Sequence, residues 1–403
     1  MSENKASVGN REIGTKSDCY VEMELLSSGG IQLELKSKVA SLFGKSITKL
    51  VNDILAFYKV DNAHIYLEDK GAVDFVLAAR IEAAIRQLKK TDKEYLLPQL
   101  KENKLPTKKD IFRISRLYLP GNTPKLMLNA GIHKPNGLIL DLEDAVSPNK
   151  KYEARFIVRN ALRNLNFYGA ERMVRINQGD MGLEDLRFIV PHYANLILIP
   201  KCESKEDIIR VDDEIQKLKK QFSIENDIWL MPIIESAKGV LNAYDIASAS
   251  KNISSMAIGL EDYTADLGVQ RTDEATESFF ARNMLVTAAR AASIQAIDSV
   301  FSDVSNMEAL ALNVQKSKGL GFDGMGCIHP RQIRVIHENF APTVKEIDKA
   351  KRIYLAFLEA KEKGLGVVSL GTKMIDAPVV KRAETTIRIA EETGILEKNW
   401  RSE

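Results

Sequence analysis

Short apolar runs recur through the middle of the chain, and each is followed by a segment in which apolar residues return at helical spacing. Runs with few polar interruptions are typical of strands that are covered on both faces, as in a parallel sheet. We therefore predict eight strands between about 112 and 339. The runs are RLYLP (116–120), GLILDLED (137–144), MVRIN (173–177), NLILIPK (195–201), IWLMPIIES (228–236), SMAIGLED (255–262), AIDSVF (296–301) and GFDGMGCIH (321–329).

The segments between these runs carry helix signals. Ser204 precedes the amphipathic stretch 205–222, and Asp207 follows it by three residues, a spacing that predicts a capping box. Eight alternations of strand and helix predict an α/β fold, a (β/α)8 TIM barrel. A doubly wound open sheet also alternates, so the prediction of a closed barrel depends on the count of eight.

The N-terminal part, 1–92, has a different pattern. YVEMEL (20–25) and IQLELK (31–36) alternate apolar with polar residues and flank Ser-Ser-Gly-Gly, which predicts a hairpin. A helix is expected over 37–58 and another over 74–88, with the strand AHIYLED between them. These elements together predict a small α+β domain.

The rest of the chain divides at changes in composition. Residues 93–110 are rich in charge and contain two prolines, which indicates a linker. The barrel is then expected over 111–340. Residues 341–403 are expected to form a helical extension, with a Gly-rich break at 363–378.

Composition narrows the class of protein. The 57 basic and 55 acidic side chains leave a net charge of +2, which argues against binding to nucleic acid or to an acidic membrane surface. The apolar runs are too short to span a bilayer, and the first 14 residues lack the apolar core of a signal peptide. The 3 cysteines are scattered, too few for a disulfide framework. We expect a cytoplasmic enzyme.

Polar residues stand where most of the predicted strands end, which in a TIM barrel is the catalytic face. Glu235 and Asp262 end adjacent strands, so their carboxylates can converge. Oxygen ligands without a His/Cys cluster suit Mg²⁺ or Mn²⁺ better than zinc. Alternatively, the two carboxylates cap the following helices or pair with Lys201 or Lys238. The polar residues at the strand ends are Glu143, Asp144, Arg175, Asn177, Lys201, Glu235, Glu261, Asp262 and His329.

Eight ordered motifs within 112–385 resemble the citrate lyase β-subunit, a branch of the wider malyl-CoA lyase and HpcH/HpaI aldolase superfamily. They are RLYLPGNTPK, LDLEDAVSPNKKYEAR, VRIN, IPKCES, IIESAKGVLNA, GLEDYTADLGVQRT, GFDGMGCIHPRQI and MIDAP. The resemblance implies a lyase that splits a 3-hydroxyacyl thioester, such as citryl thioester into oxaloacetate and acetyl thioester.

The resemblance also implies roles for single residues. Glu235 and Asp262 hold Mg²⁺, which chelates the substrate, and Arg175 donates to the substrate oxygens. Asp376 in MIDAP is the acid/base group, which enters the site from a neighbouring subunit, so a homotrimer is expected. Taken without the resemblance, Arg175 could pair with Glu143, and Asp376 could be the N-cap of the next helix.

Further residues lie in motifs that resemble the surroundings of the thioester handle. Arg113, Lys125, His329 and Pro330 are expected there, although His329 could equally be structural and the two cations merely solvated. Glu143 and Lys201 are expected to order the metal ligands and Arg175.

The N-terminal region resembles the acyl carrier (γ) subunit of citrate lyase in Gly14–Thr15, LELKSKVASLFG and EDKGAVDFVLAARIEAAI. In that family a serine shortly after the Gly-Thr pair carries a phosphoribosyl-dephospho-CoA arm. An ungapped match places Asp18 at that position, whereas a one-residue deletion places Ser17 there. Ser17 is therefore either the attachment site or an unmodified turn serine.

Three functions remain open at this point. The first is a citryl thioester lyase with a carrier domain in the same chain and an acyl-transferase (citrate lyase α-like) partner. The second is a malyl- or citramalyl-CoA lyase that acts on free CoA esters. The third is a non-catalytic carrier module that presents an acyl arm to other proteins.

Overall fold

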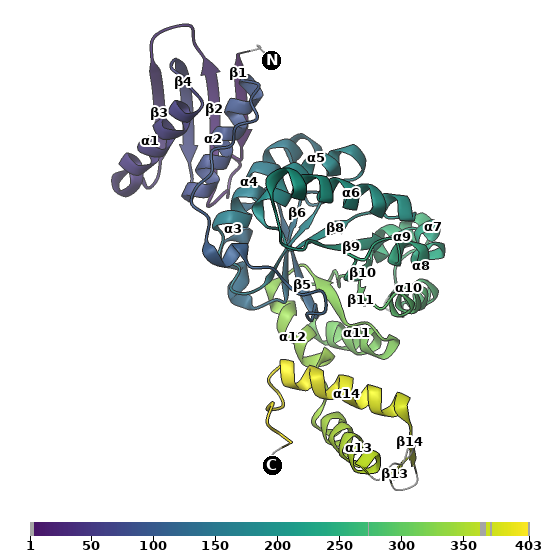
Figure 1. Ribbon diagram of the computed structural model, residues 1–403. Coiled ribbons are helices and arrows are strands. Elements are labelled where there is room, and N and C mark those ends of the chain that lie inside the picture. Colours follow the sequence, from purple (N-terminus) through teal and green to yellow (C-terminus); the bar gives the residue numbers. More distant parts are fainter. Residues whose placement is uncertain (1–3, 273, 363–367, 371–372, 402–403) are drawn as a thin grey trace.

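The computed structural model describes residues 4–272, 274–362, 368–370 and 373–401. Figure 1 shows three parts in chain order: a small α+β domain, a barrel surrounded by helices and a helical extension at the C-terminal end. Within the described residues, no helix combines the length and the apolar character that crossing a membrane requires.

Eight parallel strands close into a barrel in sequence order, which confirms the predicted TIM barrel. Their side chains are almost all buried, because helices cover the outer face and apolar side chains fill the interior. The strands are β5 (Ser115–Pro120), β6 (Gly137–Asp141), β7 (Glu171–Arg175), β8 (Leu196–Ile199), β9 (Trp229–Ile234), β10 (Ser255–Ile258), β11 (Gln295–Asp298) and β12 (Gly324–Cys327).

The helices of the barrel lie between and after these strands (Figure 1). The capping box predicted at Ser204 is present, with Asp207 bonded back to the Ser204 backbone. The helices are α3 (Pro124–Met127), α4 (Lys151–Asn164), α5 (Gly179–Ile189), α6 (Lys205–Phe222), α7 (Ala237–Leu241), α8 (Ala243–Ala247), α9 (Leu260–Leu267), α10 (Phe279–Ala291), α11 (Met307–Leu320) and α12 (Pro330–Phe340).

The N-terminal domain has a four-stranded sheet covered by two helices. Its strands β1 (Lys5–Gly9), β2 (Cys19–Leu25), β3 (Ile31–Ser37) and β4 (Ala63–Asp69) follow the order β1-β2-β4-β3. The helices are α1 (Ala40–Phe57) and α2 (Asp74–Leu88).

The predicted hairpin between β2 and β3 is wrong, because β4 lies between them, antiparallel to β2 and parallel to β3. Burial explains the order. Alternate residues of β4 are fully buried, which suits a central strand, whereas every residue of β3 keeps some exposure, as an edge strand can.

The segment 93–110 connects the two domains while lying against the barrel. It contains a short 3₁₀-helix (Lys101–Lys104), in which buried Asn103 donates to the carbonyls of Leu162 and Leu165 at 3.0 and 2.8 Å. Helix α2 also packs on α4. The N-terminal domain is therefore attached to the barrel through the segment 93–110 and through helix α2.

The C-terminal extension consists of α13 (Val344–Glu362), β13 (Val368–Leu370), β14 (Lys373–Ile375) and α14 (Ala377–Glu392). It has an apolar cluster of its own, which includes Ile353, Ile387 and Trp400. Residues 363–367 of the predicted Gly-rich break lie outside the described part of the chain.

Candidate active site

A cavity of about 410 Å³ opens at the carboxyl ends of the barrel strands. It is lined by polar residues from several strand ends together with apolar side chains and Arg116 of β5. Three of the lining residues carry the predicted chemistry: Arg175, Glu235 and Asp262. The structure therefore brings Arg175 and both predicted metal ligands to one cavity.

Arg175, the last residue of β7, is held in place by carboxylates at and just after the end of the neighbouring strand, β6. Its Nε and Nη2 donate to the two oxygens of Asp141 at 2.7 and 2.6 Å, and its Nη1 lies 3.0 Å from Glu143 Oε2. Burial lowers the pKa of Arg175, but the hydrogen bond and charge of Asp141 outweigh it and raise that pKa above its usual value. The guanidinium stays charged and its plane is set before a ligand binds.

Asp141 is a site residue that the sequence analysis missed. Its carboxylate ends β6 and is 1% exposed, and it lines the same cavity. A signal for it exists in LDLED, where three acidic residues follow an apolar run. Glu143 and Asp144 were expected at the strand end, and only the strand register shows that Asp141 stands directly beside Arg175.

Glu235 follows β9, and its carboxyl group is mostly buried. Its Oε1 accepts a hydrogen bond from the backbone N–H of Lys201 at 2.8 Å. Burial, together with the charges of Asp262 and Glu143, raises the pKa of Glu235 to about 8. A carboxyl group that is destabilised as an anion in this way is stabilised by a cation.

Asp262 lies in the first turn of α9, and its carboxylate is half-exposed. Between Asp262 and Glu143 stands the ammonium of Lys201, with Nζ at 3.8 Å from Asp262 Oδ2 and 3.9 Å from Glu143 Oε1. Burial lowers the pKa of Lys201, but these carboxylates raise it above its ordinary value. Carboxylates thus outnumber cations at the mouth of the barrel.

The residues fit a hard divalent cation. The described residues contain no group of three or more His, Cys, Asp and Glu that could hold a metal. Mg²⁺ needs no such group, because it is commonly bound by one or two carboxylates and completed by water and substrate oxygens. The raised pKa of Glu235 and the all-oxygen donor set match that requirement.

Gly259 leaves the space that the Glu235 carboxylate occupies. A Cβ atom at residue 259 would lie 2.4 Å from Glu235 Oε2 and 3.0 Å from Glu235 Cβ. Only a residue without a side chain permits this close approach. Gly259 therefore positions the predicted metal ligand.

Gly259→Ala should displace the Glu235 carboxylate and weaken Mg²⁺ binding by about 10- to 100-fold, the usual effect of disturbing the support of a metal ligand. A Mg²⁺ titration of activity or of melting temperature measures this. Gly319→Ala is a matched control, since a Cβ there would meet no atom within 4 Å. Equal Mg²⁺ dependence in both variants would contradict the positioning role of Gly259.

The prediction that Arg113 contacts substrate is wrong. Arg113 precedes β5, so it lies at the amino ends of the strands, opposite the cavity. It is 0% exposed, and its Nε and Nη2 donate to the carboxylate of Glu171 at 2.8 and 2.9 Å. Arg113 is part of a buried ion pair that closes the bottom of the barrel.

The other residues predicted near the thioester handle lie in two places: His329 and Pro330 at the start of α12, and Lys125 on α3. His329 is the N-cap of α12: its Nδ1 accepts from the Arg331 backbone N–H at 3.2 Å, and Pro330 occupies the first turn. This is the structural role that the sequence analysis left open for His329. Lys125 is exposed on α3, which follows β5 on the cavity side of the barrel.

Asp376 is not brought to the cavity by its own chain. It lies in the C-terminal extension as the N-cap of α14, where its Oδ1 accepts from the Val379 N–H at 3.2 Å. Figure 1 shows this extension beyond the barrel, next to α12. The capping role is the one expected from the sequence without the family resemblance.

In the N-terminal domain, Asp18 and Ser17 differ in burial and in pairing. Asp18 is 1% exposed and paired with Arg80, whose Nε and Nη2 donate to it at 3.0 and 2.9 Å. Ser17 is half-buried, with a positive φ of 56°. The residue that the ungapped match selects is therefore a buried ion-pair partner, which leaves Ser17 as the adjacent hydroxyl.

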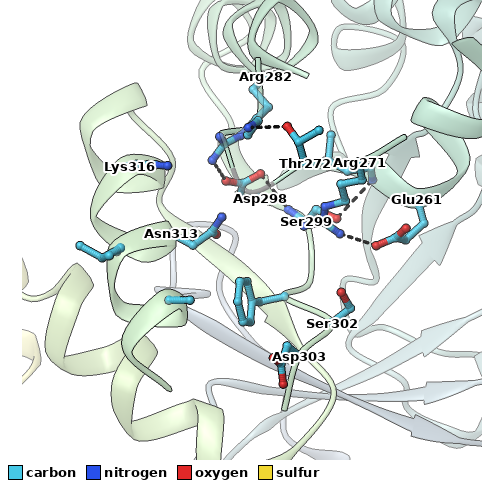
Figure 2. Close-up of a pocket in the computed structure, with 15 residues that line it drawn as sticks. Glu261, Arg271, Thr272, Arg282, Asp298, Ser299, Ser302, Asp303, Asn313 and Lys316 are labelled. Atoms are coloured by element: carbon cyan, nitrogen blue, oxygen red, sulfur yellow. Dashed lines mark hydrogen bonds and ion pairs between the residues drawn. The ribbon is translucent and has the colours of Figure 1, made fainter. Parts of the chain in front are cut away.

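A second cavity, of about 440 Å³, adjoins the first and shares Glu261, Asp298 and Ser299 with it (Figure 2). Two arginines in its wall are already paired. Arg271 Nη1 donates to Glu261 at 2.6 Å, and Arg282 forms an ion pair with Asp298. Their charge is balanced within the wall, in contrast to the crowded carboxylates of the first cavity.

Two family models match the chain. Residues 114–330 match HpcH/HpaI aldolase/citrate lyase, and residues 4–88 match malonate decarboxylase delta subunit (MdcD), an acyl-carrier family. The two matches correspond to the barrel and the small domain.

Known proteins with similar sequences or structures match about 70% of the chain. The citrate lyase subunit beta of Haemophilus influenzae is 40% identical over 289 residues, which cover 71% of this chain and 99% of that protein. The human mitochondrial citramalyl-CoA lyase is 31% identical over 314 residues, 75% of this chain and 92% of that protein. The crystal structure of CitE from Mycobacterium tuberculosis with magnesium, acetoacetate and coenzyme A has a TM-score of 0.57 and 28% identity, and covers 69% of this chain and 98% of its own.

Proposed function

The chain belongs to the HpcH/HpaI aldolase/citrate lyase family, and we propose that it is a Mg²⁺-dependent carbon–carbon lyase that cleaves a citryl thioester into oxaloacetate and an acetyl thioester. One observation carries the proposal: Arg175, Glu235 and Asp262 line a single cavity at the catalytic face of the barrel. A related structure that holds magnesium together with coenzyme A supports the same reading.

Cleavage breaks the carbon–carbon bond next to the hydroxyl-bearing carbon. The hydroxyl gives its proton to solvent water and becomes the keto oxygen, while the electron pair of the broken bond passes to the thioester half as an enolate. Mg²⁺, when bound by Glu235 and Asp262, would supply Lewis-acid stabilisation to the oxygens of the keto-acid half.

The chain's own residues prepare the site for these charges. Asp141 fixes the guanidinium of Arg175, so its remaining N–H groups can donate to a substrate oxygen as negative charge develops. Glu143 bonds to Gln178 at 2.8 Å and lies beside Arg175 and Lys201, which orders both cations. Among the residues named for the thioester handle, Lys125 is the cation on the open side of the barrel.

We propose that Asp376 protonates the enolate carbon, or removes that proton in condensation, in the site of a neighbouring subunit. Its distance from the cavity of its own chain supports this arrangement, which requires an oligomer, and we propose a cytoplasmic homotrimer.

Asp376→Asn should lower kcat by at least about 100-fold, the usual contribution of a general acid or base. Mg²⁺ affinity should stay unchanged.

Asparagine also caps helices well, so Asp376→Asn preserves the start of α14. Subunit mixing tests the trans role: Asp376→Asn and Glu235→Gln chains, each inactive alone, should recover activity when they assemble together. No recovery from mixed oligomers that light scattering shows to have formed would contradict it.

The test of the function itself is a panel of thioesters. Citryl-, citramalyl- and malyl-CoA are incubated with the full chain, in Mg²⁺ or in EDTA, and oxaloacetate, pyruvate or glyoxylate is detected. We expect Mg²⁺-dependent release of oxaloacetate. Release of pyruvate or glyoxylate instead would favour the second candidate, a citramalyl- or malyl-CoA lyase, which the human relative makes plausible. No keto acid from any ester would favour the third, a carrier module.

We propose that the N-terminal domain carries the acyl group on a phosphoribosyl-dephospho-CoA arm at Ser17, with an acyl-transferase subunit as its loading partner. The match to an acyl-carrier family and the buried pairing of Asp18 support Ser17 as the site. Intact mass of the protein from its native host, compared with Ser17→Ala, tests the attachment. An unmodified wild-type chain with full activity on free CoA esters would contradict it.

A further inference from the structure

A buried arginine lies inside the barrel. Arg116, on β5, is 1% exposed, and its Nη1 lies 2.8 Å from Met231 Sδ on β9, the strand directly across the barrel. Tyr118, two residues further along β5, packs against the interior cluster, so Arg116 is on the inward face of the same strand.

Arg116 differs from the three other arginines that are less than 2% exposed. Arg80, Arg113 and Arg159 each form an ion pair with a buried carboxylate. Arg116 forms none with any carboxylate in the described ranges, and its buried Nε has no hydrogen-bond partner. Burial lowers the pKa of Arg116 to about 10, so at neutral pH the guanidinium is still charged.

An unpaired buried charge destabilises a fold, and proteins rarely keep one without a ligand that neutralises it. Arg116 lines the 410 Å³ cavity together with Asp141, Arg175 and Glu235. It stands four residues before the end of β5, whereas Arg175 is the last residue of β7 and Glu235 follows the end of β9. Arg116 therefore lies at the floor of the cavity, and the predicted metal ligands lie at its mouth.

The candidate substrates differ in the group that would lie next to Arg116 at the floor of the cavity. The carbon that carries the hydroxyl bears a –CH₂–COO⁻ group in a citryl thioester, a methyl group in a citramalyl thioester and a hydrogen atom in a malyl thioester. Of these three, only the citryl ester brings a second carboxylate to the keto-acid half.

We propose that Arg116 binds this second carboxylate and is the residue that selects citryl over citramalyl and malyl thioesters. The inference rests on the proposed lyase function and adds the substrate class to it. A guanidinium binds a carboxylate with paired, charge-assisted hydrogen bonds. When the citramalyl thioester binds instead, its methyl group leaves the charge of Arg116 unpaired, which disfavours that substrate.

The test is Arg116→Met, since methionine has a similar length and can pack against Met231. We expect the ratio of kcat/KM for citryl-CoA to that for citramalyl-CoA to fall by at least about 100-fold. Arg116→Lys keeps the charge and should retain more of that ratio than Arg116→Met. Equal ratios in the wild type and Arg116→Met would overturn the proposal.

Two further measurements separate this role from a structural one. Because Arg116→Met removes an unpaired buried charge, its melting temperature should match or exceed that of the wild type, and a marked decrease would indicate a structural role instead. Calorimetry in Mg²⁺ should show that wild type binds oxaloacetate more tightly than pyruvate, and that Arg116→Met loses the difference. If no thioester is cleaved, the lyase function fails, whereas this binding difference still decides the role of Arg116.

Discussion

Glu235→Gln should lower the Mg²⁺-dependent kcat/KM by at least about 10³-fold, because the variant loses one of two proposed metal ligands and with it several kcal/mol of Lewis-acid stabilisation. Glutamine has the same shape, and its oxygen can still accept from the Lys201 N–H, so the surrounding loop should keep its conformation. Activity across a range of Mg²⁺ concentrations, with calorimetric Mg²⁺ binding, measures the effect.

The same variant should change the pH dependence of stability. The pKa of Glu235 is raised to about 8 in the folded protein, mainly by burial, from an ordinary value of 4.5. Between these values the folded state holds a proton that the unfolded state releases, so metal-free wild type should lose stability as pH rises from about 4.5 to 8. Melting curves in EDTA should show this loss for the wild type and a smaller one for Glu235→Gln.

A surface glutamate serves as the control for both measurements. Glu338→Gln, in an exposed pair with Arg334 on α12, should leave Mg²⁺ dependence and the pH profile as in the wild type. If Glu235→Gln retained the Mg²⁺ affinity and activity of the wild type, the metal site would have to be elsewhere.

Arg159→Met should destabilise the attachment of the carrier-like domain by up to about 3–5 kcal/mol, because it removes the closer arginine partner of the buried Glu82 carboxylate and leaves only Arg86 at 3.6 Å. Arg159 on α4 donates to both oxygens of Glu82 on α2, at 2.8 and 2.6 Å, and to Glu94 at 3.0 Å. Arg159 and Glu82 side chains are both 0% exposed. Urea unfolding, followed by fluorescence and by limited proteolysis after residue 88, measures the loss.

The double variant Glu82→Leu/Arg159→Met distinguishes an unpaired charge from a general loss of packing. Replacing both partners of a buried pair by apolar groups is often neutral, so the double variant should regain most of the stability that Arg159→Met loses. Lys49→Met, at an exposed pair with Asp53 on α1, should leave the unfolding midpoint unchanged. A double variant as unstable as Arg159→Met would show that the ion pair is not the cause.

The placement of the small domain has a functional consequence. α2 supplies both Arg80, which pairs with Asp18 beside Ser17, and Glu82, which pairs with α4 of the barrel. One helix thus joins the proposed attachment loop to the lyase domain through two buried ion pairs. Loosening this helix should affect transfer from a carrier-bound substrate more than cleavage of a free CoA ester.

The eight barrel strands could be predicted from the sequence because their signal is local. Strands covered on both faces are apolar throughout, and in this chain a helix signal separates each from the next. The capping box at Ser204 was predictable for the same reason, since its two partners are three residues apart. The meeting of Glu235 and Asp262 at one cavity was predictable because a closed barrel of parallel strands brings all carboxyl ends to one face.

Long-range pairing decided the rest. The order β2-β4-β3 depends on which strand is best buried at the centre of the sheet, which two alternating patterns beside a turn do not reveal. Arg113 was expected near the thioester handle, and its ion pair could not be predicted because the partner, Glu171, lies 58 residues away.

The sequence alone determined the barrel, its small companion domain and the carboxylates at its catalytic face, because these follow from local periodicity and from the geometry that closes parallel strands. Only the tertiary structure decided which charges are paired. It places Asp141 against Arg175, raises the pKa of Glu235 and leaves Arg116 with no carboxylate partner among the described residues. Pairing and burial depend on atoms that come together only when distant segments pack.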